Sequence, residues 1–160
     1  MVETSPPPYH DVETVPRTAS PPPAADPPQQ HPCNLHAEVT GTLDMIAADL
    51  ARLHVRVELA ISPDLTVKAS QSALRAIIRF ITTHAAEVAA GERMLIVALR
   101  RPAGVALVFT YEDGGQDQAM TDSALRPAQE QAALLGATLL IDVRSGIATT
   151  ITLMLRDPAA

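Results

Sequence analysis

The sequence predicts an α+β two-layer sandwich, in which a mixed β-sheet of about five strands carries three helices on one face. Three observations lead to this prediction. Apolar residues recur at helical spacing in three segments. Short runs rich in β-branched residues come in adjacent pairs separated by turn residues, which is typical of hairpins. The order helix, strand, helix, two strands, helix, two strands favours a single sheet with helices packed on it.

The chain divides into a tail, residues 1–33, and one domain, residues 34–160. The tail holds most of the 14 prolines of the 160 residues and few aliphatic side chains. Such a segment cannot bury enough apolar surface to offset the entropy of ordering, so we expect a disordered Pro-rich tail. Within it, Pro6-Pro7-Pro8-Tyr9 matches the short pattern that WW domains bind, although a proline-rich tail also produces this match by chance.

The first helix and first strand follow the tail. Leu43, Ile46 and Leu50 fall at helical spacing and predict a helix over residues 36–53. Apolar residues then alternate with charged ones over 55–61, which predicts a half-buried strand.

A second helix is predicted between Ser70, a candidate N-cap, and Gly91, a candidate stop. Its apolar stripe runs through Leu74, Ile77 and Ile81. Two hairpins are predicted around turn residues: 94–99 with 105–111, and 139–143 with 149–155.

The third helix is expected to begin near Ala124, with Asp122 as its N-cap and Pro127 in its first turn, and to stop at Gly136.

Charge and composition exclude several classes of function. The formal net charge of -6 argues against binding to nucleic acid, which needs a basic face. The N-terminus has no basic flank and no apolar run, so it is not a secretory signal, and no apolar run has the length of a membrane span. With one cysteine, no intrachain disulfide is available. We therefore expect a cytoplasmic protein that associates with neither nucleic acid nor membrane.

From about residue 40 to 156, the chain resembles the nucleotide-binding domain of the histidine kinase-like ATPases, also called GHKL or Bergerat-fold ATPases. The superfamily includes DNA gyrase, heat-shock chaperones, sensor histidine kinases and mismatch-repair ATPases. Three segments carry the resemblance: Ser72-Ala73-Leu74-Arg75, Leu135-Gly136-Ala137-Thr138-Leu139, and the stretch from Ser145 to Leu153. The resemblance implies the same two-layer fold.

The chain departs from this family at each of the three motifs that carry its chemistry. The family's magnesium-binding Asn corresponds to His84, and imidazole is a poor substitute for an amide oxygen toward magnesium. Some branches carry a water-activating Glu one turn earlier, where this chain has Phe80. At the third motif, a glycine-rich phosphate loop, the chain has Asp122, which would repel a triphosphate.

The remaining motif is the family's adenine-binding Asp-x-Gly-x-Gly box. Asp113-Gly114-Gly115-Gln116 keeps the Asp and two glycines, but in a different spacing. The same residues also suit a plain turn after a strand, and both interpretations stay open. A residual nucleotide pocket would therefore use Asp113, Gly114, Gly115 and His84, with ATP or ADP and magnesium as the residual ligand. No cofactor, no metal site and no catalytic residue are expected.

The five histidines are the other side chains that could bind metal or carry phosphate. They lie on separate segments without metal-ligand spacing. His36 precedes Ala37-Glu38, which is faintly similar to the phosphoacceptor box of sensor kinases, although a surface histidine near a helix start explains it as well.

The resulting expectation is a degenerate, non-catalytic histidine kinase-like ATPase domain that acts as a regulatory protein-interaction module in bacterial signal transduction. Its partner would be a protein of the kinase, response-regulator or sigma-factor type, and a homodimer is compatible with the sequence. Two alternatives stay open: a stand-alone ATP-binding serine kinase of the anti-sigma type, and a histidine phosphotransfer protein that uses His36.

Overall fold

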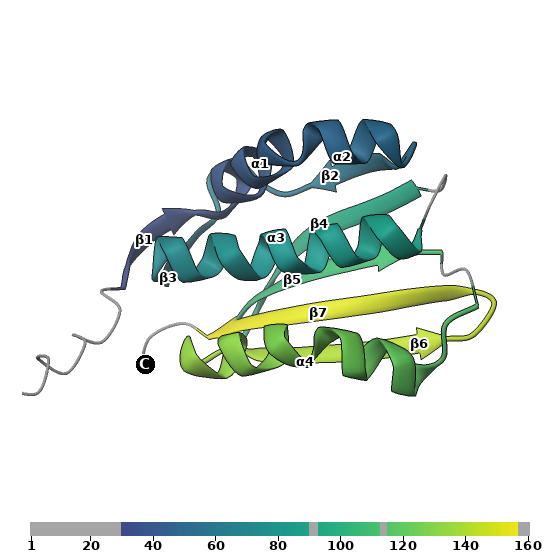
Figure 1. Cartoon of the computed structure of the whole chain (residues 1–160). Coiled ribbons are helices and arrows are strands. Elements are labelled where there is room, and N and C mark those ends of the chain that lie inside the picture. Colours follow the sequence, from purple (N-terminus) through teal and green to yellow (C-terminus); the bar gives the residue numbers. More distant parts are fainter. Residues whose placement is uncertain (1–29, 90–92, 113–114, 157–160) are drawn as a thin grey trace, which may run out of the picture.

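A computed structural model describes residues 30–89, 93–112 and 115–156 of the chain (Figure 1). The helices are α1 (Leu35–Met45), α2 (Ala47–Arg52), α3 (Gln71–Val88) and α4 (Gln118–Leu134). The strands are β1 (His31–Asn34), β2 (Arg56–Ala60), β3 (Thr66–Ala69), β4 (Arg93–Arg101), β5 (Gly104–Tyr111), β6 (Thr138–Arg144) and β7 (Ala148–Arg156).

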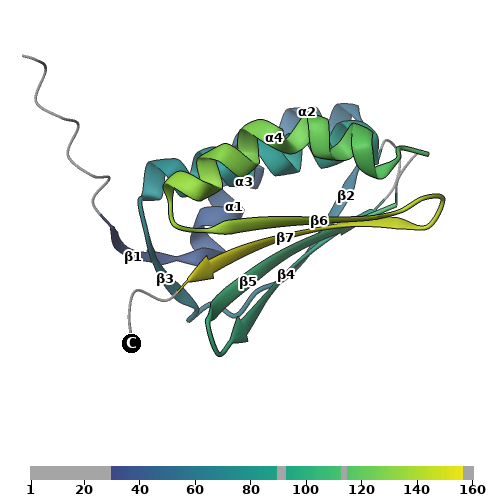
Figure 2. The same cartoon turned by 90° about the horizontal axis from the view of Figure 1, so that it is seen from below.

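The main sheet has five strands in the order β2-β4-β5-β7-β6. The β2 and β4 strands run parallel, and the other neighbours are antiparallel, so the sheet is mixed. Figures 1 and 2 show the helices in one layer on one face of this sheet. The predicted two-layer sandwich is therefore confirmed, as are both predicted hairpins.

The core lies between the two layers. Alternate side chains of the strands point toward the helices, among them Ile96, Phe109 and Ile151, which are neighbours in the register of β4, β5 and β7. All three are fully buried, as are Ile77 and Ile81 on the inner face of α3. The apolar stripe predicted for this helix is therefore the face of α3 that is buried against the sheet.

The predicted helix over 36–53 is two helices. At Ile46 the backbone leaves helical geometry (φ −108°, ψ 13°), and its amide bonds back to the carbonyls of Thr42 and Leu43. This change of direction lets α1 and α2 wrap around the core, with Ile46 buried and Leu50 packed against the core cluster. Continuous helical spacing of apolar residues could not reveal the break.

A second, two-stranded sheet pairs β1 with β3 in antiparallel register, His31 opposite Ala69. Neither strand was predicted. His31 to Cys33 fall within the segment predicted as a tail, and residues 1–29 of that segment lie outside the described residues. The Cys33 side chain is buried, and burial raises the pKa of its thiol, with a smaller contribution from the charge of Glu38.

The α4 helix begins six residues earlier than predicted. Its N-cap is Asp117, whose carboxylate accepts a hydrogen bond from the Met120 amide at 2.8 Å. The prediction of Asp122 as N-cap was wrong, because Asp122 lies inside the helix and accepts from Gln118 Nε2 at 2.8 Å. Pro127 is also interior. Burial of Leu125 and Ala128 outweighs the helix-breaking tendency of that proline.

The ends of α3 and α4 were predicted with mixed success. Gly136 ends α4 with φ +70°, and the amides of Gly136 and Ala137 bond to the carbonyls of Ala133 and Ala132, which is a Schellman motif. Ser70 occupies the N-cap position of α3, but its hydroxyl makes no capping hydrogen bond within the described part of the chain and lies 3.3 Å from the Ser72 hydroxyl. Gly91 lies outside the described residues.

None of the helices in the described ranges is long and apolar enough to cross a membrane.

Candidate functional site

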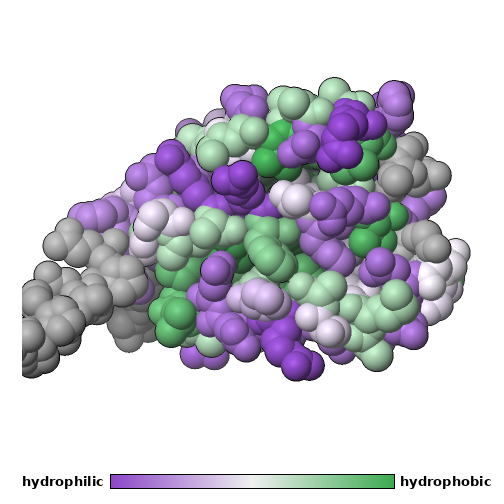
Figure 3. All heavy atoms as spheres, viewed as in Figure 1, coloured by the Kyte–Doolittle hydropathy of each residue, from purple (hydrophilic) through white to green (hydrophobic). Residues whose placement is uncertain are grey.

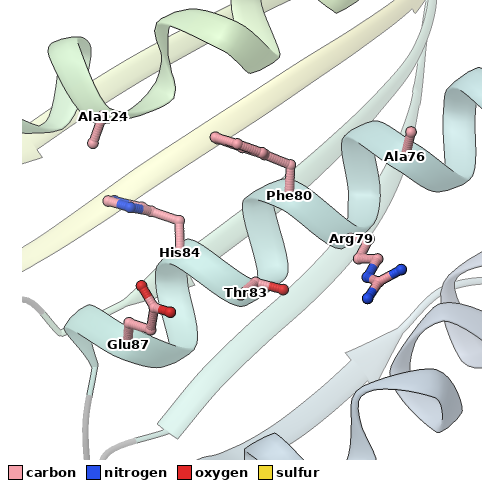
Figure 4. A pocket seen from close by; sticks show the side chains of 7 residues that line it. All are labelled: Ala76, Arg79, Phe80, Thr83, His84, Glu87 and Ala124. Atoms are coloured by element: carbon pink, nitrogen blue, oxygen red, sulfur yellow. The ribbon is translucent and has the colours of Figure 1, made fainter.

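A pocket of about 580 Å³ lies between α3 and α4 (Figure 4). Its walls come from successive turns of one face of α3 and from a single residue of α4, because residues three and four apart share a helix face. The lining residues are Ala76, Arg79, Phe80, Thr83, His84, Glu87 and Ala124.

Two rings of α3 form the side of the pocket that faces α4. Figure 4 shows Phe80 and His84, one helical turn apart, both pointing toward the α4 side, with the His84 ring directed at Ala124. Arg79 points away from α4. Figure 3 shows apolar side chains over the middle of α3 on this face of the molecule, and a mixture of hydrophilic and apolar side chains over α4. The pocket is therefore largely apolar, with charged groups at its edge.

His84 is the polar group of the α4 side. Its Nε2 is buried and has no hydrogen-bond partner within the described part of the structure. Burial lowers the pKa of His84 below its ordinary value of 6.5, and the charge of Glu87 acts in the opposite direction with a smaller effect. Burial therefore favours the neutral imidazole, whose buried Nε2 has no hydrogen-bond partner among the described residues.

We expect the stability of the domain to depend on the protonation of His84. Since the unfolded chain takes up this proton at a higher pH than the folded chain, the free energy of unfolding should fall as the pH drops through 6.5 and level off below the folded pKa. Urea unfolding at neutral and mildly acid pH should show a smaller loss for His84→Gln than for the native chain. An equal loss in the variant and the native chain would show that protonation of His84 does not cause the pH dependence.

The other residues predicted to line a nucleotide pocket are distributed differently. Asp113 and Gly114 lie outside the described residues. Gly115 follows β5 and is exposed. Its φ of +96° favours glycine, and this fits both the plain turn and the adenine-binding glycine box. Asp122 lies in the second turn of α4, not at its N-terminus, so it does not stand at the helix end where phosphates would bind. The described residues thus place His84 and Phe80 together in the pocket.

Several lining residues were missed by the sequence reasoning. Arg79, Thr83 and Glu87 had no motif to mark them. Helical spacing would have placed them at the same site, because Glu87 follows His84 by three residues, Thr83 follows Phe80 by three, and Arg79 precedes Thr83 by four. Ala124 could not be found this way, because its position follows from how α4 packs on α3.

A second, apolar pocket of about 330 Å³ lies farther along the same two helices. Ala73 and Ala76 of α3 and Leu134 of α4 contribute to it, and Ala76 is shared with the first pocket. Leu134 is 83% exposed. The two pockets adjoin at Ala76, which lines both.

The described residues contain no group of three or more His, Cys, Asp or Glu side chains that could hold a metal ion. His36, the candidate phosphoacceptor, lies half-buried in the first turn of α1.

Comparison with known proteins identifies the fold. No family model matches the sequence, and no curated protein matches it. Among solved structures, the catalytic domain of histidine kinase ThkA has a TM-score of 0.71 at 10% identity, over 82% of this chain and 99% of that one. Histidine kinase AdeS of Acinetobacter baumannii has a TM-score of 0.72 at 12% identity, over 81% and 68%. The mycobacterial sensor histidine kinase MprB has a TM-score of 0.67 at 15% identity, over 81% and 99%.

The chain therefore has the fold of histidine kinase catalytic domains, as its sequence predicted. Identities this low show the fold alone, and the function has to be argued from the residues of the site.

Proposed function

We propose that this domain is a non-catalytic variant of the histidine kinase-like ATPase fold, which acts as a regulatory protein-interaction module in bacterial signal transduction. The observation that carries the proposal is the pair Phe80 and His84 on the α3 wall of the pocket.

The chemistry of this pair argues against turnover of magnesium-ATP. Phe80 can neither accept a proton nor orient a water molecule. The neutral imidazole of His84 is a poor ligand for magnesium, which prefers oxygen. Both residues therefore weaken binding or activation of the triphosphate.

Support for a protein partner comes from a related structure. Histidine kinase ThkA in complex with the response regulator protein TrrA matches with a TM-score of 0.66 at 10% identity, over 81% of this chain and 42% of that one. We propose a partner of the response-regulator, kinase or sigma-factor type for this domain, in the cytoplasm. The segment 1–33 would serve as its tether, and a second copy of the chain would be a further partner.

Nucleotide should leave the thermal stability of the chain unchanged. A ligand at 100 times its dissociation constant adds about 2.7 kcal/mol to the free energy of unfolding, which is easily seen as a shift of the melting temperature. We expect no shift with millimolar magnesium-ADP or a non-hydrolysable ATP analogue, whereas an active histidine kinase catalytic domain measured in parallel should shift. A shift that disappears in Asp113→Asn would show a functional nucleotide pocket and contradict the proposal.

The second candidate is a stand-alone serine kinase of the anti-sigma type. It is favoured by the match to the histidine kinase ShkA in complex with AMPPNP, with a TM-score of 0.69 at 16% identity, over 82% of this chain and 32% of that one. In this candidate, Asp113, Gly114, Gly115 and His84 would hold ATP. Phosphorylation of a co-expressed partner that is lost in Asp113→Asn would identify this activity. Acid-labile phosphate lost in His36→Gln would instead identify the phosphotransfer alternative.

A further inference from the structure

The two pockets between α3 and α4 adjoin at Ala76, and we call them the paired pockets. Their walls are mainly apolar. Leu134 of α4 is largely exposed at one end, and the rings of Phe80 and His84 point toward α4 at the other end (Figure 4). A segment that covers these side chains would remove apolar surface from water and stabilise the covered state.

The N-terminal part of the chain enters the fold at the Leu134 end of the paired pockets. His31 of β1 lies opposite Ala69, the last residue of β3, and α3 begins two residues later at Gln71. Figures 1 and 2 both show β1 at the end of the molecule where α3 begins and α4 ends. Ala73, in the first turn of α3, lines the nearer pocket. The residues that precede β1 are therefore attached beside these pockets.

The segment that precedes β1 is rich in proline. Residues 21–28 read Pro-Pro-Pro-Ala-Ala-Asp-Pro-Pro, and Asp26 is the only charged residue among them. Proline-rich segments favour the extended polyproline II helix. Apolar grooves with aromatic walls bind this conformation, because a preformed helix has little entropy to lose on binding. The composition of the segment therefore suits the apolar, ring-lined paired pockets.

The length of the segment also suits the paired pockets. Ala73 and His84 are eleven residues apart on α3, which is about 17 Å along the helix axis. A polyproline II helix over residues 21–28 would span about 25 Å. Residues 29–30 would provide the chain reversal, as Ser70 does between β3 and α3. With its last proline near Ala73, the segment would reach His84.

The single charge of the segment has a candidate partner at the paired pockets. Arg79 lines the larger pocket, is exposed, and forms no ion pair within the described part of the chain. With Pro28 near Ala73, both Asp26 and Arg79 would lie within about 10 Å of Ala73 along the helix. The long side chain of Arg79 can therefore reach the carboxylate of Asp26.

We propose that residues 21–28 bind in the paired pockets of the same chain. The first three prolines would cover the rings of Phe80 and His84, and the last two would cover Leu134. Attachment at β1 holds the segment at an effective concentration of about millimolar, so a weak intrinsic affinity is enough. This inference goes beyond the proposed function, because it concerns a contact that the chain makes with itself. A partner that uses the paired pockets would have to displace the segment.

The test compares amide NMR spectra of the full chain and of full-length variants, without nucleotide or partner. Replacing each proline of 21–23 by serine removes the preference for polyproline II and should shift the amide signals of Phe80 and His84. Replacing each proline of 6–8 by serine is the matched control and should leave both signals in place. All six substitutions precede β1, so every core residue of the domain stays unchanged.

Charge reversal tests the contact between the segment and α3. Asp26→Lys would set a lysine beside Arg79, and it should shift the His84 signal as the 21–23 variant does. Combining Asp26→Lys with Arg79→Glu should return the His84 signal toward its native position. Asp11→Lys, at an acidic residue outside the segment, is the control and should have no effect.

Three results would overturn the proposal. The first is that the signals of Phe80 and His84 stay in place in the 21–23 variant, and the second is that both proline variants shift them equally. The third is that these signals move when the native chain is diluted, because the segment would then occupy the pockets of a second copy. Since no nucleotide is present, none of these results bears on the proposed loss of ATP chemistry.

Discussion

Replacing Phe109 by alanine should lower the free energy of unfolding by about 4 kcal/mol, the usual cost of removing a large aromatic side chain from a core. Phe109 is fully buried on the inner face of β5, the central strand of the sheet. Its neighbours in register, Ile96 and Ile151, are also fully buried. Their positions are set by the sheet, so they cannot move enough to close the cavity that alanine would leave. Urea unfolding followed by circular dichroism measures the loss.

Two variants serve as controls for this prediction. Phe109→Leu keeps most of the volume and should cost about 1 kcal/mol. Thr110, the next residue on the same strand, points to the face of the sheet away from the helices. Thr110→Ala should cost less than Phe109→Ala, because it creates no internal cavity. A loss below about 1 kcal/mol for Phe109→Ala would mean that β5 does not lie at the centre of the core.

The fold could be predicted because its core residues repeat at regular intervals. Ile77 and Ile81 follow the helical period, and turn residues bound β4 and β5. The local sequence is therefore enough to indicate these elements. The short strands β1 and β3 have no such signal. They are four residues each, they pair with one another over a long sequence separation, and β1 contains Pro32. Their formation depends on tertiary packing.

The start of α4 was misplaced because Pro127 was taken as a mark of the first turn. The actual start is specified by Asp117, an ordinary N-cap residue that the apolar pattern did not emphasise. In addition, Gln118 binds across to β6, with its side-chain oxygen accepting from the Val143 amide at 2.9 Å. This contact fixes the first turn of α4 and cannot be read from local sequence.

Part of the candidate site follows from local sequence for the same reason. Phe80 and His84 lie one helical turn apart on α3, and both line the pocket. The opposite wall of the pocket is Ala124, and it depends on the position of α4, which the sequence did not give.

The second large effect is expected at Arg75. The carboxylate of Glu38 on α1 is nearly inaccessible, with the residue 4% exposed, and it accepts hydrogen bonds from Arg75 Nε and, at 2.7 Å, from Gln71 Nε2 of α3. Arg75→Ala would leave a buried carboxylate with one neutral donor. Loss of one partner of a fully buried ion pair costs about 3–5 kcal/mol, but the Arg75 side chain is 50% exposed and partly screened. We expect a loss of about 2 kcal/mol, measured by urea unfolding.

A double-mutant cycle separates this ion pair from a general effect of truncation. Glu38→Gln removes the charge and keeps the shape, so Arg75→Ala should cost clearly less in the Glu38→Gln background than in the native chain. The matched control is Arg52→Ala, because Arg52 pairs with Asp49 at 3.5 Å on the surface, where both side chains are largely exposed and a salt bridge contributes little. If Arg75→Ala cost no more than Arg52→Ala, the buried carboxylate would not be what fixes α1 against α3. The α1–α3 packing would then depend on its apolar contacts, and Leu35→Ala, at a fully buried position of α1, would be the more damaging change.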